Sequence, residues 1–200
     1  PVIYGMYISA GCRLALGTAS ISEVQVDFKS VDLMLGENKQ PEFVELTRGR
    51  HCIPALSHVL SDGTSFSMTE SRSIARYLSR IGNGKICVNF ERRPDLTARV
   101  EEWLDYDGTC LYKRVGAIAY HRLYQMYDSP QEKDFEILRK SLHYIQDALR
   151  SQSDPKYLVG ETLSIADIVV ANTLSMLSCV PEIDLEIEFP FVNSWLVNLL

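Results

Sequence analysis

The sequence predicts two regions, a mixed α/β region in the N-terminal part and an all-helical region after it. Up to residue 81, short apolar runs alternate with patterns of helical period. The stretch 82–85, Gly-Asn-Gly-Lys, has the composition of a linker. After Pro94, apolar residues recur only at helical spacing. We therefore expect one domain at 1–81, a linker at 82–93 and a helical domain at 94–200.

The first region predicts the element order β-α-β-α-β-β-α. Two runs, 2–8 and 24–28, have the β-branched and aromatic content or the alternation of strands, and a helical pattern over 12–21 lies between them. A strand-helix-strand unit favours a parallel pair with a right-handed crossover. A short helix at 42–46 should follow Pro41.

A hairpin and a capped helix complete this region. Pro54 interrupts an apolar run, which indicates an edge position, a bend or a cis bond. The turn at 61–64, Ser-Asp-Gly-Thr, should join two strands. Thr69 is then expected to cap a helix whose first turn carries Glu70 and Ser71. Free N–H groups and the helix dipole favour a ligand carboxylate there.

The second region predicts a helical bundle. Periodic apolar stripes indicate helices over 96–119, over 135–149 and from 189 onward. Ser164 and Asp167 have the spacing of a capping box, with Asp in place of the usual Glu. That box opens an apolar run at 168–177, which is too short to cross a bilayer and is typical of a buried central helix.

Composition argues against several functional classes. The net charge is −6 and no basic cluster occurs, which disfavours a nucleic-acid surface. No window of eighteen apolar residues exists, which argues against a membrane span. The five cysteines are an odd number, scattered and without CxxC spacing, so reduced thiols in a cytoplasmic protein are expected. His121 and His143 lack partners at ligand spacing, so no metal is expected.

Two stretches carry a resemblance to a known family. The ordered set of Ile-Pro-Ala-Leu at 53–56, a short hairpin and Thr-Glu-Ser-Arg-Ser-Ile-Ala-Arg-Tyr-Leu at 69–78 resembles the glutathione-binding half of a cytosolic glutathione transferase. The stretch 157–167 is similar to a helix start in the all-α domain of that family. The resemblance covers essentially the whole chain. It implies a thioredoxin-like N-terminal domain followed by a helical-bundle C-terminal domain.

The resemblance also implies how glutathione, the co-substrate, is held. Pro54 would be cis, the Ile53 backbone would pair with the cysteinyl group, and Glu70 and Ser71 would hold the γ-glutamyl end. No other cofactor is implied.

Further positions are assigned to glutathione and to the electrophile. Asn38 and Cys52 fall where theta-like members carry a histidine near the glycine end of glutathione and, commonly, a lysine. In the helical half, spacings of i, i+4, i+7 and i+11 put four residues on one helix face. The resemblance suggests that Asp107 reaches glutathione across a dimer interface. It assigns the rest of this face to the electrophile pocket, namely Trp103, Cys110 and Arg114.

Three residues are candidates for stabilising the glutathione thiolate. Ser9 precedes a Cys12-Arg13 pair, which resembles the theta-type pattern, and it is our first choice. Tyr7, six residues before Arg13, is similar in spacing to tyrosine-type classes and comes second. Cys12 comes third, because a cysteine at a helix start can have a lowered pKa and form mixed disulfides. Apart from the resemblance, Ser9 is a helix cap and Cys12 a small buried apolar residue.

These observations lead to one main function and two alternatives. The main hypothesis is a cytoplasmic, homodimeric, theta-like glutathione transferase for detoxification of small apolar electrophiles, with peroxide reduction as a side activity. One alternative is a non-catalytic scaffold similar to the transferase-like domain of the elongation factor complex gamma subunit or of synthetase complexes, whose partners would be translation proteins. The other is a thiol-disulfide oxidoreductase acting through Cys12.

Overall fold

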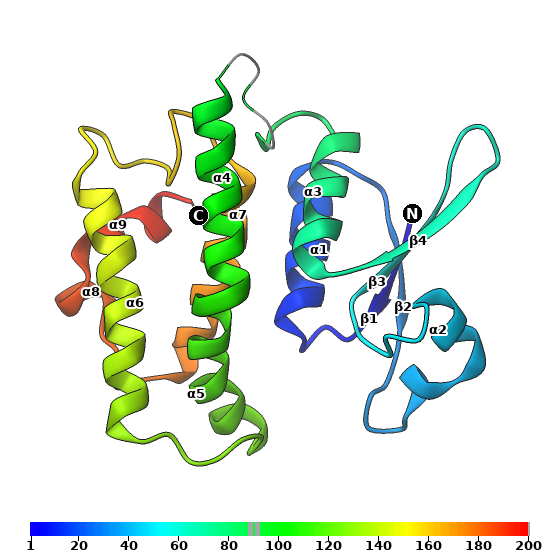
Figure 1. Cartoon of the computed structure of the whole chain (residues 1–200), viewed down its shortest axis with the longest axis horizontal. Helices are drawn as coiled ribbons and strands as arrows, with labels where there is room; N and C mark the ends of the chain where they lie inside the picture. The colour runs from blue at the N-terminus through cyan, green and yellow to red at the C-terminus, as the bar shows by residue number, and fades with distance from the viewer. Residues whose placement is uncertain (88–89, 91–92, 200) are drawn as a thin grey trace. The chain divides into compact units, whose positions relative to one another are not determined.

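The computed structural model describes residues 1–87, 90 and 93–199, and the chain divides into two compact units, Pro1–Val88 and Asn89–Leu200 (Figure 1). The linker expected at 82–93 and the end of the helical domain at 200 include positions 88–89, 91–92 and 200, which lie outside the described residues. The domain boundaries at 81 and 94 therefore stay predictions.

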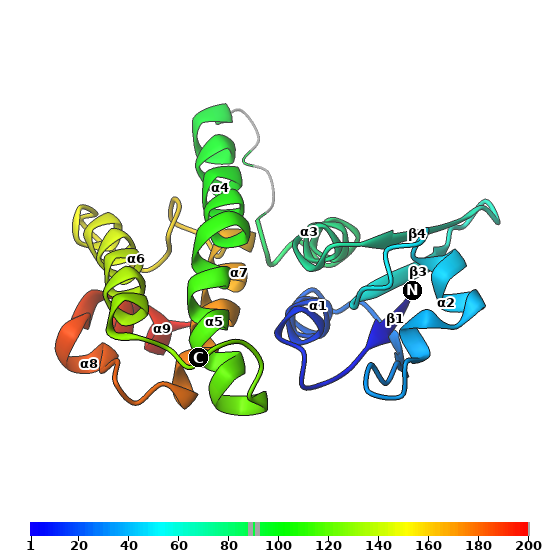
Figure 2. The same ribbon diagram turned by 60° about the horizontal axis from the view of Figure 1, so that its bottom comes forward.

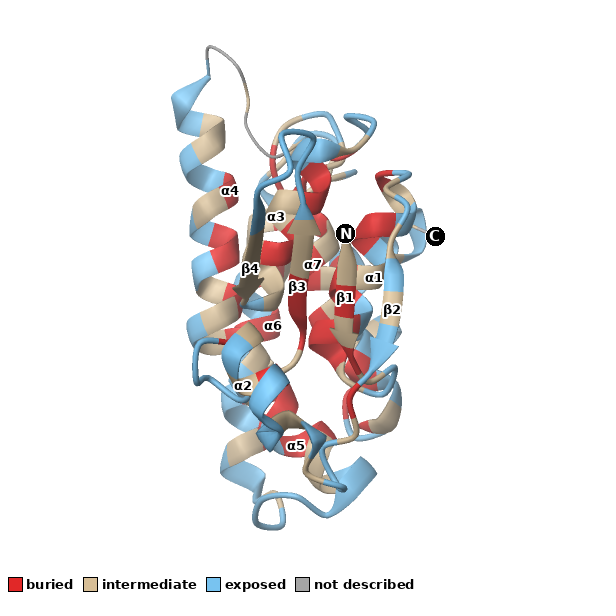
Figure 3. Cartoon of the chain, turned by 90° about the vertical axis from the view of Figure 1, so that its right-hand side faces the viewer, coloured by how far each residue is buried: buried red, intermediate tan, exposed pale blue. Residues whose placement is uncertain are grey.

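The N-terminal unit has the predicted order of helices and strands, with one additional 3₁₀ turn. Its elements are β1 (Val2–Gly5), α1 (Ala10–Ile21), β2 (Asp27–Ser30), η1 (Glu37–Lys39), α2 (Pro41–Leu46), β3 (Ala55–Val59), β4 (Ser65–Thr69) and α3 (Ser71–Ile81). In the described residues the strands form one four-stranded sheet in the order β2-β1-β3-β4 (Figure 3). β1 pairs parallel with β2, whereas the β1–β3 and β3–β4 pairs are antiparallel. The thioredoxin-like fold class is confirmed.

Each face of this sheet has its own apolar cluster. Ile3 of β1 and Leu56 of β3 are fully buried against α1 and α3, which lie side by side (Figure 2). The preceding residue on β3, Ala55, packs on the opposite face with Phe43 of α2. This is the period-two alternation of a strand covered on both faces. Burying each large aliphatic side chain contributes roughly 1.5–3 kcal/mol.

The start of α3 differs from the sequence prediction. Thr69 does not cap this helix, because it is the last residue of β4 and pairs with Ala55 in the β3–β4 ladder. The N-cap position belongs instead to Glu70, whose φ of 73° lies in the left-handed region and whose side chain makes no capping bond. A non-glycine residue in this region is strained, and such strain is concentrated at functional sites.

The regular elements of the C-terminal unit are all helical among its described residues. Its elements are α4 (Pro94–Tyr106), the π-helical segment η2 (Asp107–Leu111), α5 (Tyr112–Tyr124), α6 (Glu132–Arg150), α7 (Ile165–Leu174), the 3₁₀ segment η3 (Ser175–Cys179), α8 (Leu185–Glu188) and α9 (Pro190–Asn198). The predicted stripe over 96–119 is thus interrupted by a π turn. None of the helices described is long and apolar enough to cross a membrane.

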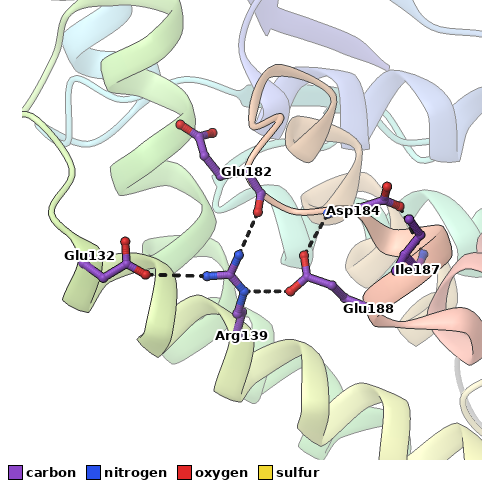
Figure 4. A network of polar contacts seen from close by, with 6 residues as sticks. All are labelled: Glu132, Arg139, Glu182, Asp184, Ile187 and Glu188. Atoms are coloured by element: carbon purple, nitrogen blue, oxygen red, sulfur yellow. Dashed lines mark hydrogen bonds and ion pairs between the residues drawn. The ribbon is translucent and has the colours of Figure 1, made fainter.

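A polar network joins α6 to the segment that contains α8 (Figure 4). Arg139 of α6 donates from Nε to Glu188 Oε2 at 2.7 Å and from Nη2 to the backbone oxygen of Glu182 at 2.7 Å. The other Glu188 oxygen accepts from the backbone N–H of Asp184 at 3.0 Å. The hydrogen bond from Arg139 lowers the pKa of the Glu188 carboxyl. This network fixes the short α8, which the sequence did not predict.

Candidate functional site

Ser9 stands at the N-terminus of α1 with its hydroxyl oxygen aimed at the first turn. Its backbone is extended, and its Oγ accepts a hydrogen bond from the Cys12 N–H at 3.4 Å. The Arg13 guanidinium donates to the backbone oxygen of Ile8 at 2.7 Å and holds the turn that leads into Ser9. Oγ accepts from the helix, and the same hydroxyl hydrogen-bonds the Cys12 thiol and lowers its pKa, so donation to a ligand would have to replace that bond. Ser9 itself is half-buried.

Gly11 brings three chain segments into close contact. It is fully buried in the first turn of α1. A Cβ atom placed on it would lie 3.1 Å from Pro54 Cδ, 3.3 Å from Ser71 Cβ and 3.5 Å from Ser71 Oγ. The start of α1, the residue before β3 and the first residue of α3 therefore meet at this glycine. The structure thus brings together the stretches that carry Ser9, Pro54 and Ser71, three of the residues singled out in the sequence.

The start of α3 presents donors next to this contact. Ser71 is its first residue and is half-buried, and the first intrahelical bond runs from the Ile74 N–H to the Glu70 oxygen at 2.9 Å. The preceding N–H groups of the helix have no intrahelical acceptor and lie at the positive end of the dipole. The exposed carboxylate of Glu70 forms an ion pair with Arg50. An exposed pair of this kind contributes about 0–1 kcal/mol, so a ligand charge can compete with it.

Asn38 and Cys52 lie on the segment that leads to Pro54. Asn38 Nδ2 donates to the backbone oxygen of His51 at 2.9 Å, and His51 Nδ1 lies 3.2 Å from the backbone oxygen of Asn38. Asn38 Oδ1 is buried without a hydrogen-bond partner among the described residues. Cys52 is half-buried, and the Ile53–Pro54 peptide bond is cis. The Asn38 side chain therefore braces the chain just before Ile53.

The expected lowering of the Cys12 pKa is wrong. Its side chain is 0% exposed, and burial raises the pKa of the thiol more than the Ser9 hydrogen bond, the Met6 backbone and the Arg13 charge lower it. The sulfur packs tightly on Gly5, where an added Cβ would lie 2.2 Å from Sγ. Cys12 is therefore a small buried apolar residue, as the alternative interpretation held.

Tyr7 lies in the same turn but points elsewhere. Its side chain is 65% exposed, and its ring centroid lies 4.3 Å from that of Phe28. Its place as second candidate for the thiolate donor stays a prediction.

The helix face expected to carry Trp103, Asp107, Cys110 and Arg114 is altered by the π turn, which places an extra residue in one helical turn. Trp103 is buried, with its ring 5.3 Å from that of Tyr144, whereas Cys110 and Arg114 are only half-buried.

The structure also changes the interpretation of Asp107 and Arg114. Asp107 is fully buried within the chain, which argues against a carboxylate that reaches a ligand across an interface, and that role stays a prediction. Arg114 donates from Nη1 to Ser141 Oγ of α6 at 2.6 Å and links two helices. Trp103, Cys110 and Arg114 keep their electrophile-pocket assignment only as a prediction.

Sequence reasoning missed the contact at Gly11. The available signal was a glycine in the first turn of a helix, where it lowers helix propensity and therefore needs a packing reason. Sequence reasoning also did not predict the ion pair between Arg50 and Glu70.

Comparisons with known proteins give a family model and a curated relative. A family model described as "Glutathione S-transferase, C-terminal domain" matches residues 116–200. The chain is 29% identical over 197 residues to glutathione S-transferase D7 of Anopheles gambiae, covering 98% of this chain and 84% of that protein.

Solved structures are similar over nearly the whole chain. A delta-class glutathione transferase of Nilaparvata lugens shares 27% identity with a TM-score of 0.82, over 99% of this chain and 87% of that one. A glutathione transferase homologue of Drosophila mojavensis with bound glutathione has 19% identity and a TM-score of 0.79, over 99% and 86% of the two chains, and supports the fold. The theta-like subclass stays a prediction. The family model, the curated relative and the solved structures together support a place for this chain in the cytosolic glutathione transferase superfamily.

Proposed function

We propose that this protein is a catalytically competent glutathione transferase that joins the glutathione thiolate to small apolar electrophiles, with Ser9 as the donor to the thiolate. The observation that carries the proposal is the contact at Gly11, where Pro54 Cδ and Ser71 Cβ lie within 3.3 Å of the Cβ position, two residues from Ser9. A hydroxyl donor and an anion-binding helix start thus share one site.

The tripeptide would be held mainly by main-chain groups. The Ile53 backbone, which precedes the cis bond to Pro54, would pair with the cysteinyl group. Ser71 and the N–H groups of α3 would take the γ-glutamyl carboxylate, and Glu70 the amino group. Asn38 and Cys52 would lie near the glycine end, where His51 and Arg50 supply the neighbouring basic groups.

The proposed chemistry is nucleophilic substitution or addition by sulfur. Binding releases the thiol proton to solvent, and the Ser9 O–H donates to the sulfur anion. Each unit by which the thiol pKa falls corresponds to about 1.4 kcal/mol in favour of the anion. The sulfur lone pair then forms a bond to the electrophilic carbon, and a leaving group such as chloride departs with its bonding electrons. With an epoxide, the ring C–O bond breaks instead and water supplies the proton to the oxygen.

The remaining predictions belong to the same proposal. They are a homodimer, a cytoplasmic location, a detoxification role and reduction of peroxides by the same thiolate. The scaffold alternative is not favoured, since the curated relative is named as a transferase. Oxidoreductase chemistry through Cys12 is disfavoured by the burial of its thiol.

Substitution of Ser9 tests the proposal directly. Ser9→Ala should lower kcat/KM for a chlorinated aromatic substrate by about 10²–10³-fold, the range seen when one donor to a developing anion is removed. Glutathione affinity, measured by calorimetry, should change little. Ser71→Ala should show the opposite pattern, with weakened glutathione binding.

Ser9→Thr is the matched control, because it keeps both the hydroxyl and the capping acceptor and should retain most of the rate. Since Ser9→Ala also removes a cap, it should cost about 1 kcal/mol of unfolding free energy, which denaturation would measure separately. Equal rates for wild type and Ser9→Ala would rule out Ser9 as the donor and move the assignment to Tyr7. A wild-type protein with neither glutathione binding nor turnover would refute the proposed function.

A further inference from the structure

Two glycines in α1 have very different surroundings. Gly11 is fully buried between Pro54 and Ser71, with the Cβ position 3.1 Å from Pro54 Cδ. Gly17, six residues later on the same helix, is exposed, and a Cβ placed on it would meet nothing within 4 Å among the described residues. Both glycines lower helix propensity by the same backbone effect. Of these two glycines, only Gly11 has neighbours so close that they leave little room for a side chain.

The distances at Gly11 leave little room for a methyl group. Carbon–carbon contacts are most favourable at about 3.5–4.0 Å. The Pro54 Cδ and Ser71 Cβ contacts, at 3.1 and 3.3 Å, would both have to lengthen by a few tenths of an ångström. Pro54 is buried and begins the stretch that enters β3, and Ser71 is fixed as the first residue of α3. Neither atom is the end of a flexible chain, so the segments themselves would move away from α1.

That movement would separate the Ser9 hydroxyl from the residues that bind the peptide frame of glutathione. Ser9 belongs to the start of α1, on one side of the contact. Ile53 and Ser71, which would hold the peptide frame of glutathione, lie on the other side. If the two sides move apart, the sulfur of bound glutathione moves away from the Ser9 hydroxyl. The contacts of the peptide frame with Ile53 and Ser71 stay intact, because those residues lie on the same side. Hydrogen bonds weaken steeply with such displacement.

We propose that Gly11 is a positioning residue that sets the distance between the Ser9 hydroxyl and the sulfur of bound glutathione. This inference rests on the proposed function and deepens it. Because Gly11 has no side chain, the Ser9 hydroxyl and the segments that bind the peptide frame can lie close enough to contact the same glutathione molecule. Gly11 contributes no chemical group of its own.

The test compares Gly11→Ala with Gly17→Ala in the full chain. The pKa of bound glutathione is followed by the ultraviolet absorbance of its thiolate, and affinity is measured for both glutathione and S-methylglutathione. S-methylglutathione keeps the peptide frame but has no ionisable thiol, so it reports on the frame alone. Thermal unfolding midpoints are recorded for both variants.

We expect Gly11→Ala to raise the pKa of the bound thiol by about half a unit to one unit and to lower kcat at neutral pH about three- to tenfold, because displacements well under 1 Å already affect rates at reacting centres. Its affinity for S-methylglutathione should stay within about twofold of wild type. Gly17→Ala should leave the thiol pKa and kcat unchanged and raise the unfolding midpoint through helix propensity.

Other outcomes would overturn the inference. An unchanged thiol pKa in Gly11→Ala, in a wild type that ionises the thiol, would show that Gly11 does not set this distance, with the proposed function intact. Loss of S-methylglutathione binding, or failure of Gly11→Ala to fold, would show that Gly11 serves the fold or the frame in general. A wild type that binds glutathione without lowering its thiol pKa refutes both this inference and the role of Ser9.

Discussion

Helices α1 and α7 both have a serine at the N-cap, but the two serines differ in burial and in their hydrogen-bond partners. At α7, Asp167 accepts hydrogen bonds from the Leu158 N–H at 2.7 Å, from the Ser164 N–H and hydroxyl at 2.9 and 2.7 Å, and from Trp195 Nε1 at 3.1 Å. At α1, Ser9 accepts one long bond of 3.4 Å and is half-buried. Ser164 and Asp167 are 0% exposed.

The start of α7 therefore serves stability, whereas the start of α1 is accessible for chemistry. Burial raises the pKa of Asp167, and the four donors oppose that rise by favouring the anion. Both oxygens of Asp167 accept hydrogen bonds from within the protein, so this carboxylate serves the fold. The start of α1 has no acidic residue in its first turn, and its serine is only half-buried. The capping box at α7 was predicted and is confirmed.

The largest effect is expected at α7. Asp167→Ala should lower the free energy of unfolding by about 3–5 kcal/mol, because it leaves buried donors without an acceptor. Chemical denaturation measures this loss. Asp134→Ala is the matched control at the capping box of α6, where Gln131 is exposed and a loss of about 1 kcal/mol is expected. Equal losses for the two variants would contradict the distinction between a buried start and an exposed one.

An intermediate effect is expected at the turn before α1. Arg13→Ala removes the bond to the Ile8 oxygen and should loosen the position of Ser9. We expect kcat to fall by about tenfold, since poor positioning of a catalytic group is costly, with stability changed by under about 1 kcal/mol. Arg13→Lys, which keeps a donor without the planar fork, should recover only part of the rate. A full rate in Arg13→Ala would show that the turn holds Ser9 without this clamp.

The smallest effect on rate is expected at Cys12. Cys12→Ala should keep kcat/KM within about twofold of wild type, while the gap left beside Gly5 should cost about 1–2 kcal/mol of stability. In the wild type, an alkylating reagent should modify half-buried Cys52 and Cys110 before Cys12, because burial both shields the Cys12 thiol and raises its pKa. Loss of turnover in Cys12→Ala, with Ser9→Ala active, would reverse these roles.

Much of the fold follows from local pattern. The order of helices and strands in the first unit, the hairpin and the capping box at α7 were all predicted, because period-two alternation, turn residues and cap spacing are properties of neighbouring residues. The π turn at 107–111 was not, since a shift from α to π hydrogen bonding depends on how the helix packs against its neighbours. Asp107, the first residue of that turn, is buried.

The sequence by itself determined the fold class, the resemblance to glutathione transferases and the choice of Ser9 as first candidate, because these depend on motifs whose residues lie close together along the chain. Only the tertiary structure decided that Cys12 is a buried apolar residue and that Gly11 joins Pro54 to Ser71. Both facts depend on contacts between segments that are 40 to 60 residues apart or that fold back over a turn. A sequence pattern reports which residues share a face, but burial and close approach exist only when separate elements pack against each other.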